Sequence, residues 1–439
     1  MYGNNDTVLH VNLSMFITGM SIAWTSPVLV KLSQNEWNPL GKPLTTQETE
    51  LIGSLFFIAA AVGPFLFIKS SAMLGRKMTV VICLVPMLMG YAILIFATRI
   101  ELYYLGRILN GITIGPICGL SQLYLSEIIF SVKTRGPYLA INSPALQSGL
   151  LVSYIVGTYV SVIVFNLISF LITLFVIILI AYGCPESPHF ILDSKGKAAS
   201  LYILKKLNIK EAEKELILIE EDLNKETQCS LVSLFKSEEN MKPFLMATTL
   251  LLLQQFSGIA ILMSYSQQIF LKASEILPSE QCPMVVGVMQ VLSASATTFT
   301  SKRFTRKSLL MFSLFGSGFS DLILGLYFFF EGSLCGFNWI PLVALVLFVI
   351  VYNSGLDPLP WVYLGEIFPP HFKTVGSAAS VFLYWFSFSL SSIAFNNVDI
   401  SYLFLAYSGS CFIGLVYVKL KLTETKDKTL REIQRELLT

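Results

Sequence analysis

Long apolar stretches recur along almost the whole chain, and they limit what it can fold into. Each is close to the length of about twenty residues that a helix needs to cross a bilayer. Only 13% of the 439 residues are charged, and the mean hydropathy is +0.68, whereas about a quarter of a soluble domain is charged. The sequence predicts an all-α membrane protein with twelve transmembrane helices, at residues 11–31, 51–70, 78–97, 102–124, 138–160, 162–182, 244–270, 284–301, 308–330, 339–362, 375–396 and 400–420.

Lysine and arginine are distributed unevenly between the loops on the two sides of these spans. Nine lysines lie in the segment 195–242, whereas loops on the opposite side carry only Lys31, Lys42, Arg99 and Lys272. Loops rich in basic residues remain in the cytoplasm. We therefore expect a multi-pass protein of the plasma membrane with both termini in the cytoplasm. The first ten residues lack the basic start of a cleaved signal peptide, so the first span is expected to be an uncleaved anchor.

A charged segment divides the chain into two sets of six spans. Its stretch "EAEKELILIEEDL" has apolar residues at helical spacing among charges, which predicts short amphipathic helices beneath the bundle. We expect these helices to act as a structural latch. The predicted division is an N-terminal six-helix bundle at 1–192, a cytoplasmic helical linker at 193–242, a C-terminal six-helix bundle at 243–422 and a cytoplasmic tail at 423–439.

Three short motifs of the first half return in the second half. They are "LGRKMTVV" (74–81) with "FTRKSLLM" (304–311), "YLSEI" (124–128) with "YLGEI" (363–367), and "PESP" (185–188) with "TETK" (423–426). This repetition indicates duplication of a six-span unit, which is typical of carriers whose substrate site lies between two bundles near the midplane. Pores, receptors and membrane enzymes need no such symmetry. The chain has only three histidines and no catalytic cluster, so we expect no enzyme, and no basic patch suggests nucleic acid.

The repeated motifs place opposite charges at the cytoplasmic ends of neighbouring spans. In the first half these are Arg76, Glu127 and Arg135, and the acid of the second half, Glu366, is followed by Lys373. Such pairs would hold helix ends together while one side of the carrier is closed. The alternative is that the cations only follow the rule for cytoplasmic loops and contact lipid phosphates.

Five ordered motifs resemble the signatures of the sugar-porter family of the major facilitator superfamily. They are "GRILNGITIG" with "YLSEI", "PESPHFIL", "QQFSG", "PLPWVYLGEIFP" and "TETKDKTL". Among its members the chain looks most like insect facilitative trehalose and hexose transporters. The resemblance implies the major facilitator fold, alternating access, a sugar as the small-molecule substrate and no cofactor. It also implies gating roles for Arg107 and Glu186, which lie in two of these motifs.

Two adjacent glutamines, Gln254 and Gln255, interrupt the seventh span. Polar groups inside a bilayer face the interior of a bundle or water. A side-chain amide offers two donors and an acceptor, so it can bind the hydroxyl groups of a neutral sugar without burying a charge. We interpret both residues as substrate-binding. The alternative is that their amides hydrogen-bond neighbouring helices together.

Further polar and aromatic side chains lie inside other spans and are candidates for sugar binding. Ser143 and Gln147 share one face of the fifth span, and the family has glutamine where Ser143 aligns. Tryptophan rings can stack on the apolar face of a sugar, although gate packing or an interfacial position is the alternative. The remaining candidates, on the fifth, seventh, eighth, tenth and eleventh spans, are Asn142, Tyr265, Gln290, Trp361 and Trp385.

Several positions depart from the family pattern, and these departures leave substrate choice or activity open. They are Ala72, His189, Ala260, Ser264, Lys302 and Thr305. Another departure is Asp357, in the tenth span, where the family usually has glycine. Because Pro358 follows it, Asp357 has the pattern of a helix N-cap. The alternative interpretation is a proton or cation site.

The first span contains no acidic residue, whereas proton-coupled relatives carry an aspartate there. We therefore predict a facilitative transporter that works as a uniporter. A carrier of another neutral polyol and a non-transporting sugar sensor are the alternatives. Cys282 and Cys335 fall in predicted outer loops, and a disulfide between them and two unpaired thiols both remain open.

Overall fold

The computed structural model describes most of the chain, and the helices in it account for every predicted span. No strand is present in the part of the chain that is described. The described residues are 4–34, 38–130, 138–207, 209, 212–225, 238–273, 278, 280–300, 303–330, 339–368 and 373–426.

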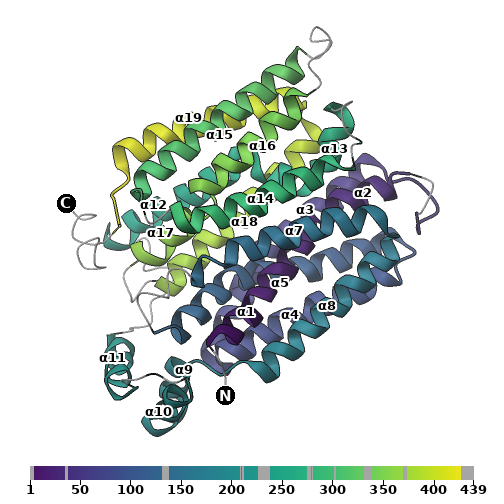
Figure 1. Ribbon diagram of the computed structural model, residues 1–439. Coiled ribbons are helices and arrows are strands. Elements are labelled where there is room, and N and C mark those ends of the chain that lie inside the picture. Colours follow the sequence, from purple (N-terminus) through teal and green to yellow (C-terminus); the bar gives the residue numbers. More distant parts are fainter. Residues whose placement is uncertain are drawn as a thin grey trace.

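The first six spans form helices that run back and forth between two sides of the molecule (Figure 1). The first span is broken at Trp24 into two helices, and the other five are continuous. The helices are α1 (Asn4–Ala23), α2 (Thr25–Leu32), α3 (Thr46–Leu74), α4 (Arg76–Ile95), α5 (Ile100–Ile128), α7 (Asn142–Tyr159) and α8 (Val162–Gly183).

The last six spans repeat this arrangement, but two of them are broken. The seventh span consists of α12 (Glu238–Gln254), a π-helical turn η2 (Gln255–Ile259) and α13 (Ala260–Ala273), and the tenth of α16 (Ile340–Gly355) and α17 (Leu359–Ile367). The continuous helices are α14 (Cys282–Thr300), α15 (Arg306–Phe329), α18 (Lys373–Asn397) and α19 (Ile400–Lys421). The prediction of twelve membrane-crossing passes in two groups of six fits this fold.

Length and apolar composition alone identify 10 helical segments, in the described chain, that could cross a membrane. The eighth span is recognised only as a shorter apolar segment, Cys282–Thr297. The fifth span, α7, is absent from both groups. It carries the polar residues Asn142, Ser143 and Gln147, which lower its hydropathy. The fifth span is therefore less apolar because it brings polar side chains, Asn142 and Gln147 among them, into the interior.

Several helices are longer than the apolar windows that predict them. Helix α3 begins with a capping box: the Thr45 hydroxyl accepts a hydrogen bond from the Glu48 N–H, and the Glu48 carboxylate accepts one from the Thr45 N–H at 2.8 Å. The helix thus starts where its free N–H groups find a cap, about five residues before the window at 51 opens.

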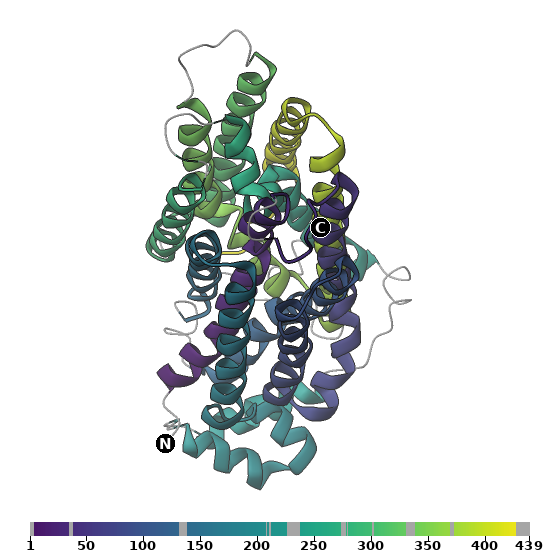
Figure 2. The ribbon, with the colours of Figure 1, turned by 90° about the vertical axis from the view of Figure 1, so that its right-hand side faces the viewer.

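Helix contacts divide the molecule into two bundles that meet along a limited set of helices. Within the first half, α1 packs on α7 and α8, and α5 packs on α3 and α4; within the second, α15 packs on α16 and α19. The halves contact each other mainly through three pairs, α3 with α18, α7 with α14, and α2 with α13. Figure 2 shows the two halves side by side around this interface.

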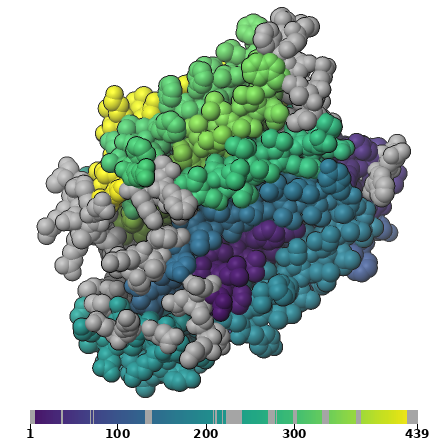
Figure 3. Space-filling model, viewed as in Figure 1, coloured from purple at the N-terminus to yellow at the C-terminus, as the bar shows by residue number. Residues whose placement is uncertain are grey.

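Three short helices that connect the two bundles in the sequence lie at one side of the molecule, at the lower left of Figure 1, where Figure 3 shows the same region as teal surface. They are α9 (Pro188–Lys195), α10 (Lys197–Lys206) and α11 (Ala212–Lys225), and they share a small apolar core of Leu192, Leu204, Ala212 and Ile219. This side is called the linker side below, and the opposite one the far side. The helical linker agrees with the amphipathic pattern, although α9 already begins before residue 193. The exact four-part division remains a prediction.

Candidate substrate site and gates

A break in the seventh span positions the two adjacent glutamines. Gln254 is the last residue of α12, and Gln255 is the first residue of the π-helical turn η2. The turn is possible because Gly258 adopts φ +87°, a left-handed conformation that glycine accepts at no steric cost. Broken helices inside a membrane are tolerated where the freed backbone lies within protein or lines a cavity. Both amides are consequently buried in the centre of the fold.

Gln254 holds two broken spans together. Its amide nitrogen donates to the Tyr352 hydroxyl at 3.0 Å and to the backbone carbonyl of Asp357 at 3.3 Å. Its amide oxygen has no hydrogen-bond partner among the described residues. The amide nitrogen of Gln254 therefore holds neighbouring helices together, and its amide oxygen is available to a ligand.

Gln255 lies in a different environment from its neighbour. It is fully buried, and neither atom of its amide makes a hydrogen bond of ordinary geometry to a described residue. The Tyr384 hydroxyl is its electrostatic neighbour on α18. A buried polar group without a partner costs about 1–3 kcal/mol, and the hydroxyl groups of a bound polyol would remove that cost.

Gln147 on α7 and Gln290 on α14 resemble Gln255. Both amides are buried, and no described residue hydrogen-bonds them. Gly287 on α14 faces Leu151 on α7, where an added Cβ would lie 3.0 Å from the leucine side chain. Because Gln147 and Gln290 each lie about one turn from this contact toward the linker side, they come to the same depth on facing helices. Amides from both halves thus lie at the same depth on helices that face each other across the interface of the bundles.

Asn142 and Ser143 lie at the start of α7, nearer the linker side. The Asn142 amide nitrogen donates to the Ser121 hydroxyl at 3.4 Å, and its oxygen has no partner among the described residues. The Ser143 hydroxyl donates to the carboxylate of Asp357 in the other half. Ser143 therefore connects the two bundles through Asp357, which the sequence pattern predicts to be a helix N-cap.

The predicted N-cap role of Asp357 is wrong. Helix α17 begins at Leu359, its cap residue is Pro358 in helical conformation, and no side chain caps it. The backbone N–H of Asp357 donates to the carbonyl of Tyr352 at 3.1 Å, which continues the turn of α16. Since the chain stays close to helical across the break, the carboxylate is free to turn toward α7.

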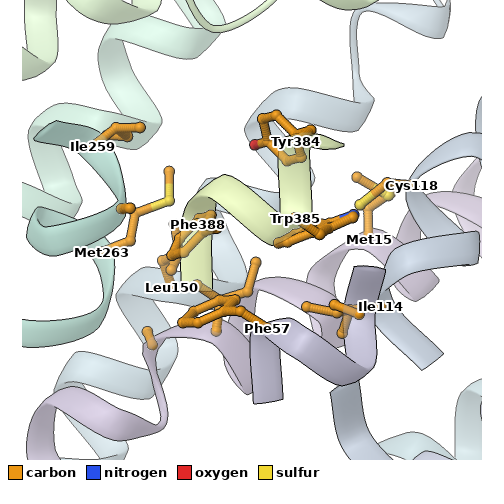
Figure 4. Packing of buried hydrophobic residues seen from close by; sticks show 14 of the residues in the cluster. Met15, Phe57, Ile114, Cys118, Leu150, Ile259, Met263, Tyr384, Trp385 and Phe388 are labelled. Carbon is orange, nitrogen blue, oxygen red and sulfur yellow. The ribbon is translucent and has the colours of Figure 1, made fainter. Parts of the chain in front are cut away.

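The two predicted tryptophans lie in an aromatic group. Trp385 is buried between Tyr384 and Phe388 of its own helix, and it stacks with Phe57 of α3 at a ring distance of 6.3 Å (Figure 4). Trp361 is partly buried and meets Tyr384 edge to face at 5.1 Å. In this structure Trp385 packs the interface between the bundles. Its indole N–H has no hydrogen-bond partner among the described residues.

Tyr265 lies in a contact that closes the far side. Its hydroxyl is 2.6 Å from the Ser392 hydroxyl, and its ring stacks on Phe395 at 4.6 Å. The same hydroxyl touches Gly53 of the first bundle, where an added Cβ would lie 2.1 Å away. Nearby, the N–H of Gln267 donates to the Ser26 hydroxyl at 3.1 Å. This position fits a gate better than the sugar contact that we predicted.

The predicted clamp on the linker side forms within the first bundle. Arg76 at the start of α4 lies 3.0 Å from the carboxylate of Glu127 at the end of α5. The Ser187 hydroxyl also donates to Glu127, and Glu186 accepts a hydrogen bond from the N–H of Lys77 at 2.9 Å. Glu186 therefore caps α4, and the four side chains connect α4, α5 and the start of the linker.

The second bundle repeats this cluster. Arg306 at the start of α15 contacts Glu366 at the end of α17 and donates to the Thr425 hydroxyl at 2.8 Å. Glu424 accepts hydrogen bonds from the N–H groups of Arg306 and Lys307, as Glu186 does from Lys77. Burial raises the pKa of Glu424, but four backbone hydrogen bonds outweigh that effect and leave the pKa below its usual value. The duplicated motifs therefore fold into duplicated contacts.

Three other predicted gating residues have different outcomes. Arg107 is fully buried in α5, and its guanidinium lies over the rings of Phe56 at 3.7 Å and Trp24 at 4.8 Å. It donates to the backbone carbonyl of Ser21, so in this structure it packs the first bundle. Arg135 and the side chain of Lys373 lie outside what the structure describes.

Sequence reasoning missed several buried polar residues. Asn353 donates to the Ser293 hydroxyl at 2.7 Å and to the carbonyl of Gln290, so it supports the eighth span beside the amide. Asp321 in α15 is buried near Gly258, and one of its carboxylate oxygens has no partner among the described residues. A polar residue inside an apolar window was the available signal for both.

Cys335 lies outside the described residues, so the choice between a disulfide with Cys282 and two unpaired thiols stays open. The described chain holds no cluster of His, Cys, Asp or Glu suited to a metal ion.

Two six-helix bundles, broken helices at their interface and central amides define a membrane transporter of the major facilitator fold. The profile of the "sugar (and other) transporter" family matches residues 8–437, and the chain belongs to that family. It is 28% identical over 450 residues to a facilitated trehalose transporter, Tret1, of Culex quinquefasciatus, a match covering 98% of this chain and 84% of the relative. Tret1 of Aedes aegypti is also 28% identical, but the match covers 54% of that protein.

Solved structures support the fold. The E. coli xylose transporter XylE, in a partially occluded inward-open conformation, superposes with a TM-score of 0.81 at 18% identity. The match covers 98% of this chain and 100% of XylE. The human organic anion transporter MFSD10 superposes less closely, with a TM-score of 0.65 at 15% identity and coverage of 94% of this chain and 99% of MFSD10.

Proposed function

We propose that the protein is a facilitative sugar uniporter that works by alternating access, with trehalose or a hexose as its substrate. The observation that carries this proposal is the set of buried, unpartnered amides of Gln147, Gln255 and Gln290. They come from both bundles and carry no charge, so they suit a neutral polyol that must be released on either side. The likeness to insect trehalose transporters supports trehalose as the first sugar to test.

Alternating access requires that one side opens while the other closes. The far side is closed by Tyr265 against Gly53 and by a 2.9 Å hydrogen bond from Asn397 to Glu50. The two charged clusters of the linker side each lie within one bundle, so they do not tie the halves together. This asymmetry supports a cycle in which the far-side contacts break when the linker side closes. We place the linker side and both termini in the cytoplasm, and the protein in the plasma membrane.

Uptake of labelled sugars by expressing cells tests the proposal. Trehalose, glucose and other hexoses should enter down their gradients, with one of them preferred. The same measurement in vesicles should give equal uptake with and without an inward proton gradient, because the predicted first span, 11–31, has no acid and Asp6, in the first turn of α1, is exposed. Accumulation that depends on the proton gradient would contradict a uniporter.

The departures at Ala260 and Ser264 favour a second candidate, a sugar sensor without transport. A sensor would bind sugar and give no flux in either assay. Binding to the purified full-length protein therefore distinguishes a sensor from a protein with no affinity for sugars.

A further inference from the structure

The bond between Ser143 and Asp357 joins the two bundles beside the candidate sugar site. Ser143 lies in the first turn of α7, and Asp357 lies in the break between α16 and α17, 214 residues away in the sequence. The amide nitrogen of Gln254 donates to the backbone carbonyl of the same aspartate. Asp357 is thus connected to the predicted site on one side and to the opposite bundle on the other.

The carboxylate has no positive partner among the described residues. The groups around it are the Ser143 hydroxyl from α7, which donates to it, and the phenols of Tyr352 from α16 and Tyr384 from α18, while the Gln254 amide from α12 donates to the backbone carbonyl of the same residue. An ionised carboxylate accepts hydrogen bonds and cannot donate them. With only hydroxyl and amide donors nearby, it is suited to a neutral ligand that supplies hydroxyl groups.

The accessibility of the pair supports this. Asp357 and Ser143 are only partly buried, whereas Gln147, Gln254 and Gln255 are fully buried. The carboxylate is also free of any structural task in its own helix, since α17 has no side-chain cap. A partly exposed group that does not cap its helix can change its partner during the transport cycle.

We propose that Asp357 is a specificity-determining residue whose carboxylate exchanges the Ser143 hydroxyl for a hydroxyl of the sugar. A sugar hydroxyl has the same donor chemistry as serine, so the exchange leaves the carboxylate hydrogen-bonded throughout. It also removes the contact between α7 and the tenth span, so binding of the sugar releases one bond between the bundles. This inference rests on the proposed function and adds a requirement for a hydroxyl donor at one position of the substrate.

The exchange gives opposite effects for the two partners. Ser143→Ala removes the competitor and leaves the carboxylate unpaired before binding, so sugar affinity should rise, by roughly three- to tenfold. Asp357→Ala removes the acceptor, and affinity should fall by about tenfold or more, the range expected for a hydrogen bond to a charged group. If the contact between Ser143 and Asp357 were purely structural, its loss would instead weaken sugar binding or lower stability in both variants.

The experiment is equilibrium binding to purified full-length protein in lipid nanodiscs, followed by tryptophan fluorescence. Ligands are trehalose, glucose and the single-deoxy analogues of whichever sugar the wild type binds. The wild type should lose affinity strongly for one deoxy analogue, and Asp357→Asn, whose amide oxygen is a weaker acceptor than the charged carboxylate, should discriminate less against that analogue. Ser148→Ala is the matched control, because Ser148 lies on the same helix and donates only to the Pro144 carbonyl at 2.7 Å.

The outcomes separate the two proposals. If the wild type binds sugar but Ser143→Ala binds it no more tightly, the exchange is wrong and the proposed function stands. The exchange is also wrong if Asp357→Asn keeps the full deoxy discrimination. If the wild type binds none of these sugars, the proposed function fails and the exchange falls with it. Should Asp357→Ala not fold, the Ser143→Ala and Asp357→Asn measurements still decide.

Discussion

Arg76 and Glu127 form an ion pair at 3.0 Å between the start of α4 and the end of α5. Both side chains are largely buried, with 19% and 9% of their surface exposed, so solvent screens the pair less than it would a surface pair. A corresponding ion pair joins Arg306 and Glu366 in the second bundle. Each pair therefore fixes the ends of two helices within one rigid unit.

Replacing Glu127 by glutamine should impair transport. The charge-assisted bonds to Arg76 and Ser187 would weaken, at a cost of about 1.5–3 kcal/mol. We expect slower initial uptake and greater labelling, from the linker side, of a cysteine introduced near Gly149. Glu101→Gln is the control, since Glu101 is exposed in the first turn of the same helix. Unchanged uptake and labelling in Glu127→Gln would show that the pair does not contribute to gating.

Gln255 and Gln254 should respond differently to alanine. Gln255→Ala removes an amide without protein partners, so half-saturation should rise about three- to tenfold while the protein level stays normal. Gln254→Ala breaks bonds to Tyr352 and Asp357, so it should lower the melting temperature as well. Concentration dependence of uptake and thermal melting of both variants provide the test. A loss of stability in Gln255→Ala with unchanged affinity would instead support helix packing for that residue.

The far-side contact between Gly53 and Tyr265 predicts a compensating pair of substitutions. Gly53→Ala places a methyl group where the tyrosine hydroxyl lies, and overpacking of this kind costs about 1–3 kcal/mol. Uptake should fall, and a cysteine introduced at Asn396 should become more reactive from the far side. Tyr265→Phe removes the hydroxyl, so the double variant should recover part of the uptake. If the double variant is no better than Gly53→Ala, the contact does not limit closure.

Glu424 predicts a dependence of stability on pH. Its pKa in the folded protein lies below the usual value, so the stability that it contributes is present above the pKa of the unfolded chain, about 4.3, and is lost as pH falls through the folded value. The melting temperature of the wild type should therefore drop when the pH is lowered below about 4.

Glu424→Gln should flatten this dependence. The variant should also be less stable at neutral pH, by about 1 kcal/mol, because a neutral amide is a weaker cap for α15. Glu221→Gln, at an exposed position of α11, serves as the control. Identical pH profiles for wild type and Glu424→Gln would rule out this contribution.

Much of the architecture follows from the sequence alone. The recurrence of apolar windows predicts the twelve passes, and the repeated motifs predict that Arg306 and Glu366 stand where Arg76 and Glu127 do. These features are local or repeated along the chain, so no knowledge of the packing is needed to recognise them. The helix breaks at Gly258 and near Pro358 occur at residue types that permit them, but Pro64, Pro86 and Pro116 lie inside continuous helices, so residue type alone does not locate a break.

The tertiary structure alone decides which polar side chains acquire partners. Gln254 and Gln255 are neighbours in the sequence, but successive helical positions point about 100° apart, and only Gln254 reaches Tyr352. Asp357 suits an N-cap by its local pattern, yet its carboxylate binds Ser143, 214 residues away. The sequence thus determines which residues are polar inside the membrane. Their partners come from distant helices, so only the packing of the two bundles determines what each of them contacts.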